Sequence, residues 1–164
     1  MNKTLILGYG NPDRQDDGVA WHILSMLGKK YGREVTLETV NEITADEINP
    51  AFLFQLQLTP ELAEDIAEYE RVCFIDAHTG NIPEEVSVSR IQPNYQQSPF
   101  THHLTPQTCL ALCETLSHRV PDAILVSVRG YEFGFSHQLS TKTSLLADEA
   151  TKIIWDWLNA NHQD

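Results

Sequence analysis

The first residues that could do chemistry lie in the stretch LILGYGNPDRQDDGVAWHIL near the amino terminus, which predicts a strand, a glycine turn and a helix. Gly8 and Gly10 permit the chain to turn sharply at the strand end. This is the layout of a phosphate-binding loop. However, Asp13 replaces the third glycine of a dinucleotide fingerprint, and there is no lysine of the Walker type. Together with Asp16 and Asp17, Asp13 would oppose phosphate at the helix start, so nucleotide binding is disfavoured.

The adjacent carboxylates Asp16 and Asp17 have two interpretations. One of them can cap the predicted helix, a role worth about 1 kcal/mol, while the other occupies the first turn, where a carboxylate is also favourable. Alternatively, one of them is a ligand in a site at the mouth of the loop. The residues of this stretch alone favour the cap and leave the ligand open.

Asp76 ends the apolar stretch VCFID, which predicts a buried strand. A carboxylate at a buried strand end is costly unless it is hydrogen-bonded or bound to a cation. If this strand neighbours the first one, Asp76 lies at the same sheet edge as the loop from Gly8 to Asp17. The equally weighted alternative is an Asx turn leading into Thr79-Gly80-Asn81.

His102 and His103 precede Thr105-Pro106, a pair typical of a helix start. Adjacent residues of an extended segment point in opposite directions, so one of the two can face a given site. Either alone could equally be a surface histidine. Cys109 and Cys113 belong to an apolar helical stripe, and we expect them in the core rather than at a metal.

Two carboxylates and one imidazole form a nitrogen and oxygen ligand set suited to Ni²⁺, Zn²⁺ or a similar divalent ion, with coordination positions left open. No serine or cysteine stands in a G-x-S-x-G pattern, which disfavours covalent acyl-enzyme chemistry.

Apolar and β-branched runs separated by helical patterns must position these residues. We expect buried strands at Thr4–Leu7, Val35–Val40, Arg71–Ile75 and Ala123–Val128, with a half-exposed edge strand at Val86–Ile91. Helices are predicted after the first loop, from Thr59 to about Tyr69, from Thr105 to about Ser117, and from about Ser140 onward. The alternation predicts an α/β fold, a three-layer sandwich whose central, mostly parallel sheet of about five strands is flanked by helices. In such folds ligands bind at the carboxyl ends of the strands.

The composition limits the choice of partners. The 164 residues fit a single domain, 1–164, and their formal net charge of -12 argues against nucleic acid and anionic membranes. No apolar run approaches the length of a membrane span, and no signal peptide is recognisable. The three cysteines have no framework spacing, which indicates a reducing cytoplasm. Nothing demands an oligomer, so we expect a monomer.

The sequence resembles the hydrogenase maturation endopeptidases over nearly its whole length. The resemblance rests on Gly8-Tyr9-Gly10-Asn11 followed by Asp16-Asp17-Gly18, on Ile75-Asp76-Ala77 at a strand end, and on His102 before a helix. The segment Gln57–Leu62 (QLTPEL) and the pair Leu139-Ser140 are similar to the branch that serves soluble, bidirectional or cofactor-coupled hydrogenases.

The resemblance implies an endopeptidase that removes the carboxyl-terminal extension of a nickel–iron hydrogenase large-subunit precursor. It carries over Asp17, Asp76 and His102 as catalytic residues and nickel ligands, with Asp16 left as the cap. Gly8, Gly10, Asn11 and Gly18 would shape the loop. The precursor would present nickel on its own cysteines, and the free enzyme would hold no tightly bound metal.

Some features depart from the family pattern. His103 stands beside His102, so the ligand could be displaced by one position. Ala20 occupies a position where the family often has glycine. The segment Asn41–Gln55 matches nothing in the pattern; it could be a substrate surface of the branch, or its Phe52, Leu53 and Phe54 could be core. The alternative function is a non-catalytic chaperone that docks on the nickel-bearing large subunit. A small-amide metallohydrolase fits the ligands but has no motif.

Overall fold

The computed structural model of the protein describes residues 3–36, 48–96 and 104–160. These residues form one five-stranded sheet in the order β2-β1-β3-β5-β4. β1, β2, β3 and β5 run parallel, and β4 pairs antiparallel with β5 at one edge. The strands are β1 (Thr4–Tyr9), β2 (Ala51–Gln55), β3 (Arg71–His78), β4 (Val86–Ile91) and β5 (Asp122–Arg129). The predicted, mostly parallel sheet and the predicted edge strand Val86–Ile91 are confirmed.

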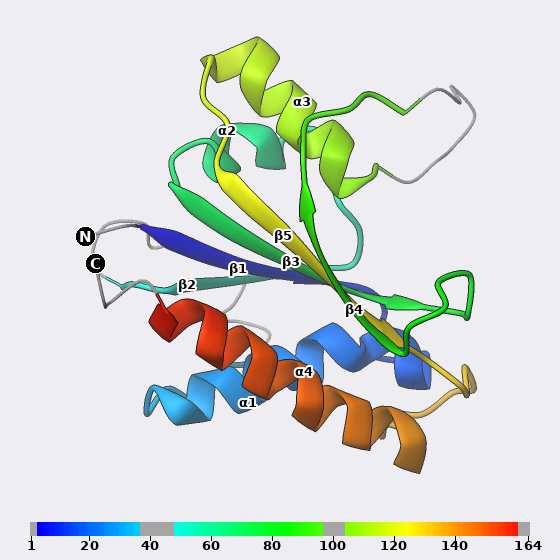
Figure 1. The fold of residues 1–164 in the computed structure, drawn as a ribbon. Coiled ribbons are helices and arrows are strands. Elements are labelled where there is room, and N and C mark those ends of the chain that lie inside the picture. The colour runs from blue at the N-terminus through cyan, green and yellow to red at the C-terminus, as the bar shows by residue number, and fades with distance from the viewer. Residues whose placement is uncertain (1–2, 37–47, 97–103, 161–164) are drawn as a thin grey trace.

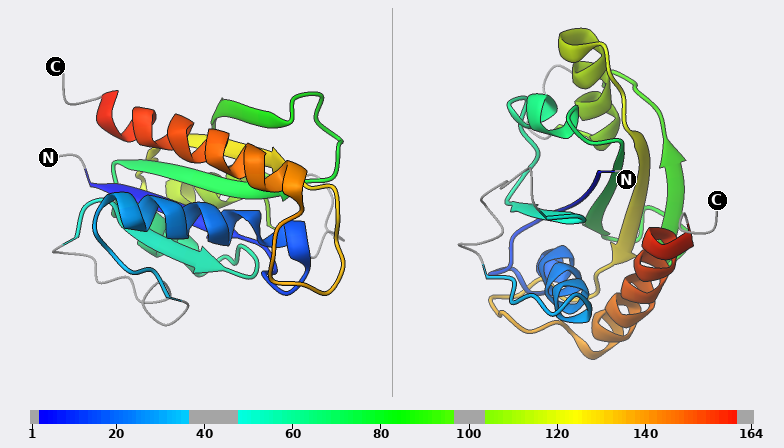
Figure 2. Two further views of the ribbon diagram at one scale, coloured as in Figure 1. Left: turned by 90° about the horizontal axis from the view of Figure 1, so that it is seen from below. Right: turned by 90° about the vertical axis from the view of Figure 1, so that its left-hand side faces the viewer.

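Helices cover both faces of the sheet, which makes the three-layer sandwich (Figure 1). α1 and α4 lie side by side on one face, and α2 and α3 lie on the other, as both views of Figure 2 show. A short 3-10 helix, η1, leads directly into α1. The helices are η1 (Gln15–Gly18), α1 (Val19–Lys30), α2 (Leu62–Ile66), α3 (Pro106–Ser117) and α4 (Thr141–Ala160).

The apolar run of β1 is explained by burial on both faces. Leu5 and Leu7 join the hydrophobic cluster under α2 and α3, whereas Ile6 joins the cluster under α1 and α4. Gly8 continues the second series, and a Cβ atom there would lie 3.0 Å from the Cβ of Ala20. The absence of a side chain at Gly8 therefore lets α1 pack close to the end of β1.

The strand beside β1 differs from the predicted one. It is Ala51–Gln55 rather than Val35–Val40. The first two residues of the predicted range lie outside any strand, and the rest lie outside the described residues. Within the unmatched segment Asn41–Gln55, Leu53 and Phe54 are core residues. Strand propensity reflects how a side chain packs, and the strand AFLFQ buries Leu53 and Phe54 beside β1.

The helix predictions are confirmed most closely where the capping chemistry is complete. Thr105 caps α3, because its Oγ1 accepts a hydrogen bond from the Thr108 N–H at 3.1 Å. α4 begins one residue after Ser140, as predicted. α2 is shorter than predicted. Turns precede it, in which the Leu62 N–H donates to the Thr59 carbonyl and the Ala63 N–H donates to the Pro60 carbonyl. Among the described residues, no helix is long and apolar enough to cross a membrane.

Candidate functional site

Three polar side chains form a row across the sheet at the carboxyl ends of its strands. Gly8 pairs with Ile75 and Asp76 pairs with Ser127, so Tyr9, Asp76 and Ser127 belong to neighbouring strands at the same level. Strand alternation places all three on the face covered by α2 and α3. The strand neighbourhood expected for Asp76 is therefore present, and it lies at the edge where ligands bind in α/β sheets.

The two oxygens of Asp76 are in different environments. The Tyr9 hydroxyl donates a hydrogen bond to Oδ2 at 2.8 Å. Oδ1 is buried and has no hydrogen-bond partner among the described residues. The alternative of an Asx turn at Asp76 is wrong, because β3 continues to His78. A buried carboxylate oxygen without a donor is costly, and a cation would remove that cost.

Burial raises the pKa of Asp76 above its ordinary value. The Ser127 and Tyr9 hydroxyls oppose this rise, whereas the nearby Asp17 carboxylate adds to it. Burial and the same Asp76 carboxylate also raise the pKa of Tyr9, which remains a neutral donor at neutral pH. The Asp17 carboxylate is near enough to raise the pKa of Asp76, and η1, which carries Asp17, packs on β3.

Asp17 is held by the loop that leaves β1. Its Oδ2 accepts a hydrogen bond from the Asn11 N–H at 2.8 Å. Gly10 has φ of +142°, and a Cβ atom there would lie 2.2 Å from the Asp17 carbonyl oxygen. A Cβ atom at Gly18 would lie 2.6 Å from Pro12 Cα. Both glycines thus allow the loop to fold tightly against η1.

Asp16 is not a helix cap, contrary to the sequence prediction. Neither η1 nor α1 has a hydrogen bond from a capping side chain. The Asp16 side chain is fully buried and accepts hydrogen bonds from the chain between Tyr131 and Thr143. Its donors are the backbone N–H groups of Tyr131, Glu132 and Ser140 and the hydroxyls of Ser140 and Thr143, at 2.7 to 2.8 Å.

The hydrogen bonds decide the charge state of Asp16. Burial by itself raises the pKa of this carboxyl group, but the donors of Ser140, Glu132 and Tyr131 outweigh burial and lower the pKa below its ordinary value of 3.8. Backbone hydrogen bonds from Asp16 N–H to the Glu132 carbonyl and from Gln15 N–H to the Ser136 carbonyl complete the attachment. Asp16 therefore joins the turn that carries Asp17 to the start of α4.

The histidine of the predicted site is not among the residues that can be placed. His102 and His103 lie outside the described residues, where the chain resumes at Leu104. His78, two residues after Asp76, is occupied by backbone groups: its Nδ1 accepts from the Gly80 N–H at 3.1 Å, and its Nε2 lies 3.0 Å from the Glu84 carbonyl oxygen. Within the described ranges, no three His, Cys, Asp or Glu side chains are grouped closely enough to hold a metal ion.

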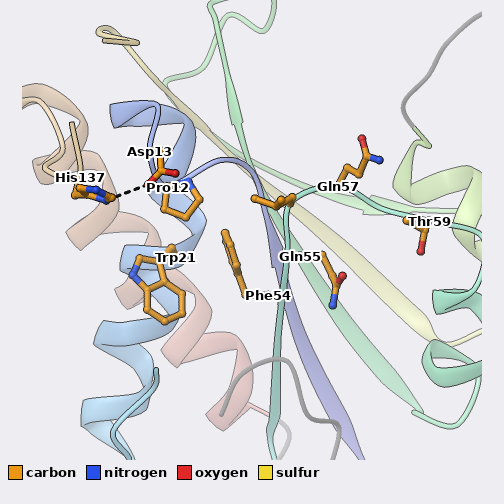
Figure 3. Close-up of a pocket in the computed structure, with 9 residues that line it drawn as sticks. Pro12, Asp13, Trp21, Phe54, Gln55, Gln57, Thr59 and His137 are labelled. Carbon is orange, nitrogen blue, oxygen red and sulfur yellow. Dashed lines mark ion pairs between the residues drawn. The ribbon is translucent and has the colours of Figure 1, made fainter. Parts of the chain in front are cut away.

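A groove of about 680 Å³ adjoins the loop that carries Asp17. Figure 3 shows Trp21 and Phe54 side by side in it, and their rings pack edge to face with centroids 5.5 Å apart. Asp13 and His137 form an ion pair at 3.3 Å across one end. The rest of the lining is Pro12, Gln55, Leu56, Gln57 and Thr59. The groove combines an aromatic wall with amide groups, a lining suited to a polypeptide segment.

Tyr9 is a residue of the site that the sequence motifs do not indicate. The segment Gly8-Tyr9-Gly10 predicts a glycine turn, whereas β1 extends through Tyr9. Its position two residues after Leu7 places it on the same face as Leu5 and Leu7. That alternation, combined with the neighbourhood of the Asp76 strand, was the signal that could have paired the two side chains.

No protein family model and no curated protein matches the sequence. Solved structures do match the fold. One is the [NiFe] hydrogenase maturation protease HycI from Thermococcus kodakarensis KOD1, with a TM-score of 0.64 and 17% identity over 96% of this chain and 92% of that one. Another is the hydrogenase maturating endopeptidase HybD from E. coli, with a TM-score of 0.62 and 19% identity over 97% and 93%. A third is an endopeptidase from Escherichia coli, with a TM-score of 0.65 and 18% identity over 97% and 93%.

These matches agree with the family indicated by the motifs. The chain shares its fold, over nearly its whole length, with structures described as hydrogenase maturation proteases. At identities of 17% to 19% the likeness establishes the α/β architecture and not the chemistry.

Proposed function

We propose that this protein is an endopeptidase that removes the carboxyl-terminal extension of a nickel–iron hydrogenase large-subunit precursor after nickel insertion. Two independent lines support this proposal. The motifs around Gly8, Asp17 and Asp76 resemble those of the maturation endopeptidases. The fold matches proteases described as acting in hydrogenase maturation, over at least 96% of this chain in the structures from Thermococcus and E. coli.

The observation that carries the proposal is that Oδ1 of Asp76 is buried and has no hydrogen-bond partner among the described residues. It belongs to a carboxylate coupled to Asp17 at the carboxyl edge of the sheet. Two converging carboxylates repel each other, and a divalent cation between them would remove both the repulsion and the unmet hydrogen-bonding capacity. The arrangement therefore suits a cation that arrives with another molecule.

In this proposal the cation is the nickel of the precursor, which its own cysteines already bind. Asp17, Asp76 and His102 complete the coordination, so docking requires a precursor that has received its metal. Oxygen and imidazole ligands from this chain complement the thiolates of the substrate. Recognition of nickel in this way makes cleavage depend on prior metal insertion, and no resident metal is required.

The chemical step is hydrolysis of one peptide bond held near the docked nickel. Water adds to the carbonyl carbon, the C–N bond breaks, and a proton passes to the departing amine. Positioning of the bond is the main contribution of the protein. A site carboxylate can act as the general base, or the nickel can polarise the carbonyl group or the water. Thiol chemistry is disfavoured, because Cys73, Cys109 and Cys113 are all fully buried.

The groove beside Trp21 and Phe54 is the proposed place for the chain on either side of the scissile bond. Its Pro12 and Asp13 wall belongs to the loop whose Asn11 N–H holds Asp17. A segment lying there would pass close to the carboxylates. We further propose that the protein works as a cytoplasmic monomer that binds neither nucleic acid nor membranes, in line with its net charge of -12.

The experiment mixes the protein with a candidate precursor, with and without nickel, and weighs the precursor by mass spectrometry. We expect loss of a carboxyl-terminal peptide only when nickel is present. Asp17→Asn, Asp76→Asn and His102→Ala should each fold normally and process the precursor at least about 100-fold more slowly. Asp148→Asn, an exposed carboxylate on α4, is the matched control and should be fully active.

Three outcomes would contradict parts of the proposal. Full cleavage by Asp76→Asn would exclude metal docking through this carboxylate. An active His102→Ala with an inactive His103→Ala would move the imidazole by one position. Nickel-dependent binding without any loss of mass would indicate a chaperone instead of a protease.

A further inference from the structure

The Tyr9 hydroxyl donates a hydrogen bond to Oδ2 of the Asp76 carboxylate at 2.8 Å. It comes from β1, whereas Asp76 comes from β3, so the contact spans two neighbouring strands. The Tyr9 ring packs against the hydrophobic cluster under α2 and α3. The hydroxyl is thus aimed by a ring whose position is fixed by the core.

The hydrogen bond makes the two oxygens of Asp76 unequal. A tyrosine hydroxyl donates one proton, so it can satisfy Oδ2 and leave Oδ1 free. Oδ1 is buried without a partner in the described part of the chain. Rotation of the carboxylate about its last torsion would turn the other oxygen away from its present direction and break the Tyr9 bond, so this bond opposes the rotation.

Among the other nearby groups, the Ser127 hydroxyl on the neighbouring strand β5 also lowers the pKa of Asp76. The side chain of His78 is engaged by the backbone at Gly80 and Glu84. The Asp17 carboxylate can accept but not donate, and it repels Asp76. Tyr9 is therefore the side chain whose hydrogen bond holds Oδ2 of Asp76, from a ring packed against the core.

We propose that Tyr9 is a positioning residue that holds Asp76 so that Oδ1 faces the cation carried by the substrate. The inference rests on the proposed function and adds a residue to it. Groups that hydrogen-bond a metal ligand orient that ligand and make it a better donor, and their loss typically costs about 10- to 100-fold in metal affinity or activity.

The test compares the wild-type protein with Tyr9→Phe, which keeps the buried ring and removes only the hydroxyl. Tyr31→Phe is the matched control, because Tyr31 follows the carboxyl-terminal end of α1 and packs on Phe52 and Trp155. Each variant is titrated with nickel-loaded and nickel-free precursor, and the ratio of the two dissociation constants is measured alongside the rate of cleavage.

We expect Tyr9→Phe to reduce the ratio about 10- to 100-fold by weakening binding of the nickel-loaded form, with little change for the nickel-free form. Tyr31→Phe should keep the wild-type ratio. A second variant, Tyr9→His, retains an N–H donor, and its ratio of dissociation constants should lie between those of Tyr9→Phe and the wild type. A merely structural role would weaken binding of both forms equally and leave the ratio unchanged.

The outcomes separate this inference from the proposed function. If Tyr9→Phe keeps the wild-type ratio while Asp76→Asn loses it, the role of Tyr9 is overturned and metal docking by Asp76 stands. If Asp76→Asn also keeps the wild-type ratio and rate, the site itself is wrong. Tyr9→Phe could also weaken binding of the nickel-loaded and the nickel-free precursor equally. The ratio of dissociation constants would then be unchanged, and this result would likewise overturn the positioning role.

Discussion

At the scale of single residues, two neighbouring aspartates have opposite surroundings. Asp16 is fully buried and accepts hydrogen bonds from five donors, whereas Asp17 is partly exposed and accepts one from the Asn11 N–H. Among the described residues, the first carboxylate therefore has little capacity left for a ligand, and the second has most of its capacity free. This difference assigns a structural role to Asp16 and leaves Asp17 available to a cation.

Replacement of Asp16 by asparagine should lower the free energy of unfolding by at least about 2 kcal/mol at pH 7, because buried donors would face an amide instead of a carboxylate. Thermal or urea unfolding of the free protein measures this. Asp13→Asn, in the same loop but exposed, is the control and should change stability by less than about 0.5 kcal/mol.

The stability difference between wild type and Asp16→Asn should depend on pH, because the pKa of Asp16 is lowered in the folded protein. A carboxyl group with a lower pKa when folded stabilises the protein above its unfolded pKa and loses that contribution as pH falls through the folded pKa. The stability difference between wild type and Asp16→Asn should therefore narrow below pH 3.8, the ordinary value. A difference that stays constant from pH 7 to pH 3 would contradict an ionised Asp16.

Gly10 and Gly32 provide a second comparison between residues. Both have positive φ, of +142° and +67°, but a Cβ atom at Gly10 would collide with the Asp17 carbonyl, whereas none at Gly32 meets an atom within 4 Å. Gly32→Ala should cost roughly 1 to 2 kcal/mol of stability and leave cleavage unchanged. Gly10→Ala should cost more and also displace Asp17, with at least about 100-fold slower processing. Equal activity of the two variants would argue against the need for this close approach.

At the scale of elements, the helix starts were predictable where local chemistry decides them. Thr105-Pro106 combines a capping hydroxyl with a proline of fixed φ, and α3 begins there. The strand at Ala51–Gln55 was not predictable from its own residues, because β-branched Val35–Val40 fits a strand better by propensity. Which segment lies beside β1 is decided by the packing of Leu53 and Phe54 in two separate clusters.

The carboxyl end of β2 carries a prediction about substrate binding. Leu56, just beyond β2, is 68% exposed and lines the groove, while Leu145 on α4 is 66% exposed and lies away from it. Leu56→Glu should raise KM for the precursor about 10-fold, since it places a charge in a partly apolar groove, and should leave kcat and stability nearly unchanged. Leu145→Glu is the matched control and should behave as wild type. If the two variants have the same KM, the groove does not hold the substrate.

At the scale of the whole molecule, the α/β class of the fold could be predicted from the alternation of strands and helices. The same alternation predicted that a ligand site would lie at the carboxyl ends of the strands. Asp76 and the loop from Gly8 to Asp17 were expected at the same sheet edge if their strands are neighbours, and β1 and β3 do pair. The role of Asp16 was beyond reach, because its donors lie more than 110 residues away in sequence. Contacts of that separation depend on the assembled sandwich and not on any local pattern.

The placement of the cysteines across both cores yields a prediction for the intact protein. All three are fully buried, and burial raises the pKa of Cys109 to about 12 and that of Cys113 to about 11. The native protein should therefore gain no mass from iodoacetamide at pH 7.5, retain its cleavage activity, and gain three adducts after denaturation. Inactivation of the folded protein by a single adduct would point to a thiol nucleophile.

The attachment of Asp16 to Ser140 and Thr143 also has a consequence for the time at which activity can first exist. On a translating ribosome the glycine loop and both aspartates emerge early, but the groups that hold their turn are made more than 110 residues later. Until α4 has been synthesised and has docked, the turn that carries Asp17 keeps the local bond from the Asn11 N–H but lacks the attachment through Asp16. A nascent chain would therefore be inert towards its substrate, and competence would appear in one late step.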